Sequence, residues 1–176
     1  MSAGSRNWSL RLARPGDAKA MADVERDADA LFTQTPEYDQ LIRGATRTQA
    51  QYHSIIAKGR SLTVECDHKI VGFAAAIAFK SELHLEELSV LRAYQRRGIG
   101  SGLVRALQAD ARNSGFSAIT LETFRAVAWN APFYAKLGFQ IIDDLERYPR
   151  LGDELARKIA AGMPPEDRCA MVAPVQ

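Results

Sequence analysis

The sequence is poor in three features that would each point to a class of protein. It has only two cysteines, Cys66 and Cys169, and they fit neither a zinc-binding spacing nor a CxxC motif. Its 23 basic residues barely exceed its 21 acidic ones, whereas a dedicated nucleic-acid binder usually has a strong basic excess. The longest apolar run, residues 71–79, is far shorter than the ~20 residues of a membrane-spanning helix. These shortages argue against a zinc protein, a nucleic-acid partner and a membrane partner.

The remaining composition is that of an ordinary soluble globular chain, with 47% apolar and 25% charged residues. A length of 176 residues favours one domain over residues 1–176, with residues 1–7 loose. The start, MSAGSRNW, has no charged segment followed by an apolar run, so we expect no signal peptide. Together with the sparse cysteines, this predicts a cytoplasmic protein.

Hydrophobic periodicity and turn residues predict the order of the elements. Seven segments have the pattern of strands: 8–13, 61–66, 70–79, 83–91, 117–124, 139–142 and 168–175. The short polar turn Asp67-His68 between the second and third segments predicts a hairpin. Five have helical spacing or helix signals: 17–32, 38–57, 103–112, 129–137 and 151–161. The predicted fold is therefore α/β, of the α+β type. A mixed, mostly antiparallel central sheet of about six to seven strands is flanked by helices.

The stretch YQRRGIGSG, residues 94–102, lies between a predicted strand and an amphipathic helix. The first amides of a helix lack intrahelical partners and lie at the positive end of its dipole. Glycine lets an anion approach these amides closely, and Arg96 and Arg97 add positive charge. The stretch therefore predicts a diphosphate site.

Three phosphate-binding templates compete for this stretch, beside an ordinary strand-to-helix turn. The nucleoside-triphosphate loop, GxxxxGK[ST], fails because no such lysine follows. The dinucleotide fingerprint, GxGxxG, fails because Leu103 takes the place of its third glycine. The template [QR]xxGx[GA] is satisfied by Gln95, Gly98 and Gly100.

The chain contains Leu88-Ser89-Val90 followed by QRRGIG at residues 95–100, and NAPFYAKLGF at residues 130–139. Together these two blocks resemble the GNAT superfamily of N-acetyltransferases. The first block is similar to the family's acetyl-CoA motif, and the second is similar to its N…FYxKLGF signature. The resemblance covers residues 61–142 well. It implies acetyl-CoA as cosubstrate, no metal, and a sheet that is splayed between strands 4 and 5.

The resemblance assigns coenzyme contacts to both blocks. Backbone amides from about Arg96 to Ser101 would bind the pyrophosphate, and residues 88–90 would pair with the pantetheine arm like an added strand. Asn130 would contact the arm, with helix capping as its alternative role. The predicted cofactor-binding residues are Leu88, Ser89, Val90, Gln95, Arg96, Arg97, Gly98, Ile99, Gly100, Ser101, Asn130 and Phe133.

The implied reaction is direct acetyl transfer to a primary amine in a ternary complex. An alkylamine has a pKa near ~10.4, so a general base is needed at neutral pH. Tyr134 matches the family's catalytic tyrosine and would protonate the leaving thiolate, unless it merely packs in the core. For the base, the fourth strand offers Glu87 first, Glu86 second and His84 third, each with a solvated strand residue as the alternative. Alternation places Glu87 and Ser89 on one face and His84 and Glu86 on the other.

The acceptor is left open as a small-molecule or protein amine. The acidic residues of the first helix, Asp23, Glu25, Asp27 and Asp29, suggest either contact with a cationic amine or a solvated acidic face. Family members are often dimers, so a homodimer is a further expectation. The alternative function is a catalytically silent acyl-CoA-binding sensor or interaction module, and the presence of Tyr134 favours the enzyme.

Overall fold

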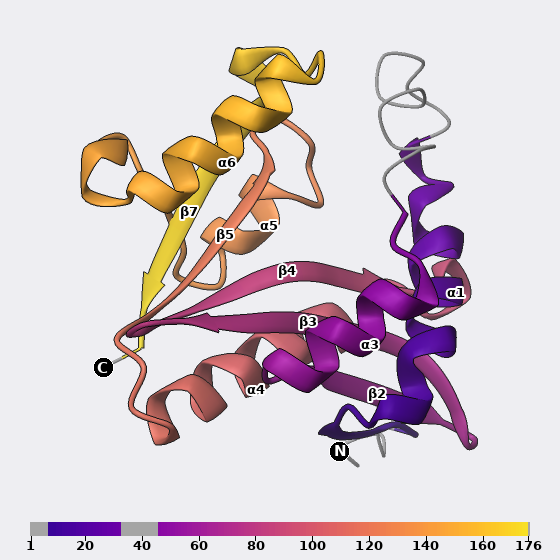
Figure 1. The fold of residues 1–176 in the computed structure, drawn as a ribbon. Coiled ribbons are helices and arrows are strands. Elements are labelled where there is room, and N and C mark those ends of the chain that lie inside the picture. The colour runs from indigo at the N-terminus through magenta and orange to yellow at the C-terminus, as the bar shows by residue number, and fades with distance from the viewer. Residues whose placement is uncertain (1–6, 33–45, 176) are drawn as a thin grey trace, which may run out of the picture. The chain divides into compact units, whose positions relative to one another are not determined.

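The computed structural model describes residues 7–32 and 46–175 (Figure 1). Its contacts group the chain into two compact units. Unit 1 runs to Ile77 and also contains Glu87–Leu107, and unit 2 contains Ala78–Glu86 and the chain from Gln108 onward. A single domain over residues 1–176 stays a prediction.

The strands form one seven-stranded sheet in the order β1-β2-β3-β4-β5-β7-β6. Their bounds are β1 Ser9–Leu12, β2 Leu62–Cys66, β3 Lys69–Phe79, β4 Glu82–Val90, β5 Ala118–Phe124, β6 Gln140–Ile141 and β7 Arg168–Pro174. β4 and β5 pair in parallel, whereas the β1–β2, β2–β3, β5–β7 and β6–β7 pairs are antiparallel. The parallel register runs only from Glu82↔Ala118 to Leu85↔Leu121, so it uses the first part of each strand. The predicted fold class is confirmed.

Helices flank the strands: α1 Ala18–Asp29, α3 Gln49–Lys58, α4 Ile99–Asn113, α5 Ala131–Ala135 and α6 Pro149–Ala160. The predicted helix over 38–57 is wrong at its start among the described residues, because residues 46–48 are not helical. Thr48 and Gln51 form a capping box that begins α3 at Gln49. Residues 38–45 of that prediction lie outside the described part of the chain. α6 begins earlier than predicted because Pro149 suits the first turn of a helix.

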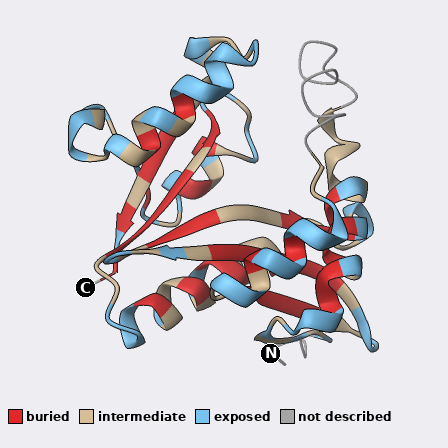
Figure 2. Cartoon of the chain, viewed as in Figure 1, coloured by how far each residue is buried: buried red, intermediate tan, exposed pale blue. Residues whose placement is uncertain are grey.

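In unit 1, α1 places a buried face against the sheet and α3. Ala18, Met21, Ala22 and Glu25 lie on this face, at positions i, i+3, i+4 and i+7. Tyr52 of α3 packs edge-on against Phe73 of β3, with ring centroids 5.1 Å apart. Figure 2 shows the buried residues concentrated in the strands and on one side of the helices. A carboxylate therefore shares the face that builds the apolar core.

The β2–β3 connection in unit 1 is the predicted tight turn. Asp67 and His68 have φ of 49° and 61°. Two successive residues at positive φ are the mark of a type I′ turn, which suits the twist of a hairpin. The predicted hairpin is confirmed.

Unit 2 has its own small core, in which Leu151 and Leu155 of α6 pack with Ala170 of β7. α5 is shorter than the predicted segment 129–137 and is followed by Gly138 at φ 89°. Among the described residues, no helix has the length and apolarity needed to cross a membrane.

Candidate active site

The glycine stretch forms a compact turn between β4 and α4 in unit 1. A 3-10 turn at Arg92–Tyr94 leads to Arg96 and Gly98, which have φ of 60° and 81°. The carbonyl of Gly98 accepts hydrogen bonds from the amide of Gly102 at 2.9 Å and from the hydroxyl of Ser101 at 3.1 Å. This carbonyl closes the first turn of α4, so the preceding amides lie at the helix N-terminus.

The amides of this turn are available to a ligand. Among the described residues, none accepts a hydrogen bond from the backbone N–H groups of residues 96–101. A Cβ built on Gly98 would meet nothing within 4 Å, so the turn is also open in front of this residue. Orphan amides at the positive end of a 15-residue helix suit an anion.

Gln95 has a structural role in this turn. Its side-chain Nε2 donates to the carbonyl of Val90 at 2.9 Å and so joins the turn to the end of β4. The amide of Leu91 donates to the carbonyl of Val71 at 2.9 Å and fixes the same strand end. The guanidinium of Arg97 lies over the ring of Tyr94, 5.1 Å from its centroid.

The last part of β4 carries Glu87 beside the predicted pantetheine residues. The hydroxyl of Ser89 donates to Glu87 Oε1 at 2.9 Å, so the predicted common face of these two residues is confirmed. Ser89 is buried, whereas the Glu87 side chain is 26% exposed. Glu87 is therefore the carboxylate of this face that a ligand can reach.

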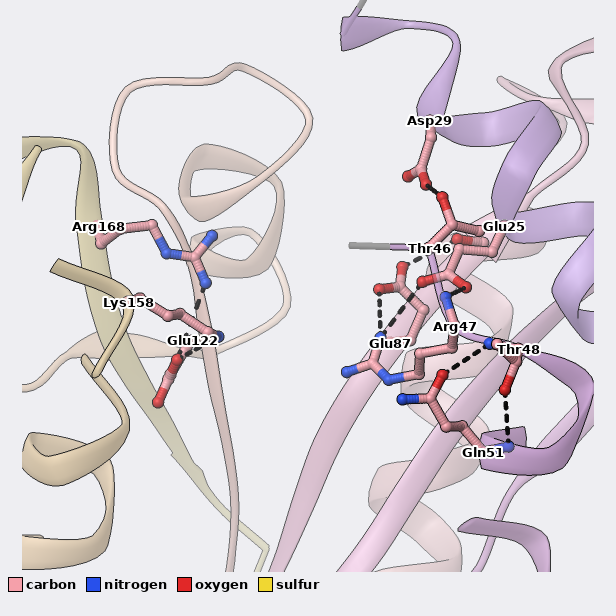
Figure 3. Close-up of polar contacts among 11 residues, drawn as sticks. Glu25, Asp29, Thr46, Arg47, Thr48, Gln51, Glu87, Glu122, Lys158 and Arg168 are labelled. Carbon is pink, nitrogen blue, oxygen red and sulfur yellow. Dashed lines mark hydrogen bonds and ion pairs between the residues drawn. The ribbon is translucent and has the colours of Figure 1, made fainter. Parts of the chain in front are cut away.

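Glu87 belongs to a polar cluster with Glu25 and Arg47 (Figure 3). Tyr52 lies near the same carboxylates, and these four residues are called here the Glu25 cluster. One guanidinium nitrogen of Arg47 lies 3.3 Å from Glu25 and 3.3 Å from Glu87. The backbone amide of Arg47 donates to Glu25 Oε2 at 2.8 Å. Residues from α1, β4 and the segment before α3 therefore meet at one point.

Glu25 is a buried acid, with a side chain only 3% exposed. Burial, followed by the negative charge of Glu87, raises the pKa of Glu25 to about 7. The solvated acidic face is thus wrong for Glu25, because helical spacing turns it toward the core. It is correct for Asp23, which is exposed and pairs with Lys19 and Arg26.

A Glu25→Gln variant tests whether Glu25 holds a proton in the folded state, because the substitution should change how the free energy of unfolding depends on pH. Because its pKa is raised, the contribution of Glu25 to the free energy of unfolding is fully present below pH ~4.5 and is lost as the pH rises through 7. A glutamine at this position stays neutral and has no such pH dependence. The free energy of unfolding of the variant minus that of wild type should therefore be about 2–3 kcal/mol larger at pH 8 than at pH 5. Urea unfolding at the two pH values measures this difference. Asp23→Asn is the control and should change stability by only about 0.5 kcal/mol; an equal Glu25→Gln effect at both pH values would contradict the prediction.

Sequence reasoning missed Arg47 and Tyr52. Thr48 at the start of α3 was a readable capping signal, and it would have placed Arg47 just before the helix and Tyr52 in its first turn. Their approach to Glu25 depends on how α1 and α3 pack, which no local pattern contains.

A buried carboxylate of unit 2 has a different environment (Figure 3). Glu122 is 2% exposed, and burial raises its pKa. Lys158 Nζ lies 2.5 Å from its carboxylate, and a guanidinium nitrogen of Arg168 lies at 3.8 Å. Two cations face one carboxylate here, whereas one guanidinium serves two carboxylates in the Glu25 cluster.

Unit 2 holds the second sequence block. Tyr134 is 8% exposed, and its ring packs edge-on against Phe133 and Phe139 at 5.1 and 5.5 Å. Asn130 precedes α5 but does not cap it with its side chain. Its Oδ1 accepts from the Thr123 hydroxyl at 2.7 Å, and its buried Nδ2 has no partner among the described residues. Asn130 therefore keeps one donor for a ligand.

The other base candidates lie in unit 2. His84 is 4% exposed, and its Nδ1 lies 3.0 Å from the Thr120 hydroxyl and 3.3 Å from the Arg150 guanidinium. These contacts give His84 a structural role. Glu86 is half-buried.

Burial and the neighbouring Asp67 raise the pKa of the Cys66 thiol, which disfavours the reactive thiolate. Among the residues that the structure describes, no group of three or more histidine, cysteine, aspartate or glutamate side chains is arranged to hold a metal ion.

The fold and the glycine turn define the class of the protein. The sequence profile of the acetyltransferase (GNAT) family matches residues 22–139, and the chain belongs to this family. The family predicted from the two motifs is confirmed.

Solved structures show the same fold. The ribosomal-protein-S18-alanine N-acetyltransferase from Escherichia coli has a TM-score of 0.70 at 18% identity, over 96% of this chain and 94% of that one. The PaiA N-acetyltransferase from Thermoplasma acidophilum, solved in complex with coenzyme A, has a TM-score of 0.72 at 17% identity, over 99% of both chains. N-acetylglutamate synthase from Neisseria gonorrhoeae, complexed with coenzyme A and N-acetyl-glutamate, has a TM-score of 0.71 at 20% identity, over 96% of this chain and 35% of that one.

Proposed function

We propose that the protein is an acetyl-CoA-dependent N-acetyltransferase that acetylates a primary amine by direct attack in a ternary complex. The observation that carries the proposal is the row of amides at residues 96–101, at the N-terminus of α4, which donate to no acceptor among the described residues. This row suits the pyrophosphate of coenzyme A. Family membership and the coenzyme complexes of two similar structures support the choice of ligand.

The proposed roles follow the chemistry of acetyl transfer. Residues 88–90 pair with the pantetheine arm, and Asn130 and Phe133 contact the coenzyme. Glu87 takes the proton of the attacking amine, and Glu86 is the second candidate. The phenol of Tyr134 protonates the departing thiolate. We also propose that the protein is cytoplasmic, that it needs no metal and that it forms a homodimer.

A Gly98→Ala variant tests the coenzyme site. At φ 81° a Cβ costs roughly 1–2 kcal/mol, so alanine should move the turn and its amides. We expect the affinity for coenzyme A, measured by calorimetry, to fall about tenfold or more. Gly115→Ala is the matched control, because Gly115 has φ 80° and equally open surroundings. It should lose similar stability and keep its coenzyme affinity; equal coenzyme affinities in the two variants would argue against the site.

An assay of thiol release from acetyl-CoA with a panel of primary amines tests the activity. Turnover with one or more amines is the expected result. Tight coenzyme binding without turnover on any amine would favour the silent acyl-CoA-binding module. Absence of coenzyme binding would refute both functions.

A further inference from the structure

Within the part of the chain that the structure describes, the Glu25 cluster contains more negative than positive charge. Glu25 and Glu87 share a single nitrogen of Arg47 at 3.3 Å each, longer than the roughly 2.7–2.9 Å of a strong charge-assisted hydrogen bond. Asp29, on the same helix as Glu25, accepts from the Thr46 hydroxyl at 2.7 Å. Burial and the charge of Glu87 raise the pKa of Asp29. With all three carboxylates ionised, the guanidinium of Arg47 neutralises only part of the charge.

Tyr52 provides a second, independent observation. It is fully buried, and its hydroxyl has no partner of good hydrogen-bond geometry among the described residues. The hydroxyl nevertheless lies close enough to Glu25 for a hydrogen bond between them to lower the pKa of Glu25. Burial, then the charges of Glu87 and Glu25, raise the pKa of Tyr52, so the hydroxyl stays an O–H donor that faces these carboxylates. An unpaired buried hydroxyl costs about 1–3 kcal/mol, and an ionised carboxylate is a stronger acceptor than a protonated one. The contact between the Tyr52 hydroxyl and Glu25 should therefore strengthen when Glu25 loses its proton.

The two carboxylates differ in access. Glu87 is 26% exposed and Glu25 is 3% exposed. A ligand can therefore touch Glu87, whereas Glu25 acts on that ligand from behind through its charge. Among the described residues, Glu87, Arg47 and Tyr52 act on the pKa of Glu25, and Asp29 lies one turn further along the same helix.

We propose that Glu87 binds the ammonium group of the acceptor and that Glu25 behind it exchanges a proton for this cation. When a primary alkylammonium binds at Glu87, the carboxyl of Glu25 releases its proton to solvent. The resulting carboxylate balances the added positive charge and accepts a hydrogen bond from Tyr52. Glu25 is thus a positioning residue that sets the charge of the acceptor site. The inference rests on the proposed function in that the bound cation is the amine substrate.

The exchange makes cation binding depend on pH. Since the cation favours ionised Glu25, loss of the Glu25 proton must in turn favour the cation by the same free energy. A positive charge that binds near a carboxyl group lowers the pKa of that group by about 1–2 units. Affinity should therefore rise about five- to tenfold between pH 6 and pH 8.

The experiment uses the full chain and n-butylamine, which is a cation throughout this range. Calorimetry at pH 6, 7 and 8, in buffers of different ionisation enthalpy, measures both affinity and protons released. In wild type we expect the five- to tenfold rise, with a proton released near pH 7. Glu25→Gln should bind with no pH dependence and no proton release. Tyr52→Phe, which keeps the ring packing on Phe73, should move the midpoint to higher pH because ionised Glu25 loses a donor.

Several controls make the outcome decisive. Asp23→Asn, on the exposed side of the same helix, should behave as wild type. Uncharged n-butanol should show no pH-dependent binding. Wild-type affinity that does not change with pH, or a pH dependence that survives in Glu25→Gln, would overturn the inference. If Glu25→Gln does not fold, the proton release of wild type and the shift in Tyr52→Phe decide.

The outcome is separable from that of the proposed function. Coenzyme A affinity of wild type and Glu25→Gln, measured on the same samples, should be equal. Coenzyme binding together with pH-independent amine binding would overturn only the role of Glu25. Proton-linked butylamine binding without coenzyme binding would leave the cation site in place and refute the acetyltransferase.

Discussion

Replacing Tyr134 by phenylalanine should lower turnover about 100-fold and leave coenzyme A affinity unchanged. A positioned general acid typically contributes about 10²–10⁴-fold, and phenylalanine removes only the phenol oxygen. The ring contacts with Phe133 and Phe139 are retained, so the fold of unit 2 should persist. The measurement is steady-state thiol release with an amine that the wild type acetylates, beside calorimetry with coenzyme A.

Tyr148→Phe is the matched control for this effect. Tyr148 also lies in unit 2, where it packs against the Leu151–Leu155–Ala170 core. Its loss of a hydroxyl should leave turnover at the wild-type level. If Tyr134→Phe also keeps full turnover, Tyr134 is a packing residue and another group protonates the thiolate.

Among the Gly→Ala substitutions considered in unit 1, Gly59→Ala should lower the free energy of unfolding the most. Gly59 lies just after α3 and forms a bridge to Ile77 of β3. A Cβ at Gly59 would stand 1.8 Å from the carbonyl oxygen of Ala76 and 2.8 Å from its carbon, both backbone atoms. The backbone must therefore separate, and we expect a loss of about 3 kcal/mol or more in the free energy of unfolding.

Gly16→Ala isolates the steric cause. A Cβ at Gly16 would meet nothing within 4 Å, and alanine there should change stability by less than about 1 kcal/mol. Urea unfolding of both variants measures the contrast. Similar midpoints for the two would show that the α3–β3 junction yields easily.

The sequence patterns that predicted the structure well were local ones. Asp67 and His68 marked a hairpin turn because polar residues adopt positive φ more readily than branched ones. The glycine turn was predictable because it combines a strand end, a helix start and a template of fixed spacing. The start of α3 was predicted wrongly, although the capping box of Thr48 and Gln51 is a local signal that begins this helix at Gln49.

The acceptor side of the site was only partly predictable. Alternation along β4 placed Glu87 and Ser89 on one face, and the hydrogen bond between them agrees. Helical spacing alone could have placed Glu25 with Ala18, Met21 and Ala22. Its partner Arg47 follows 22 residues later, and only the packing of α1 on α3 brings the two together.

The bond between Gln95 and the Val90 carbonyl gives a physical reason for a choice within the motif. The template [QR]xxGx[GA] accepts glutamine or arginine at this position, two side chains that differ in charge. Both are long and end in N–H groups, so either can satisfy the last carbonyl of β4. Glutamate has the length of glutamine, but its carboxylate has no N–H group and would face the Val90 carbonyl, which is also an acceptor. The interchange of Gln and Arg would thus preserve a scaffold bond, while the anion is left to the main chain.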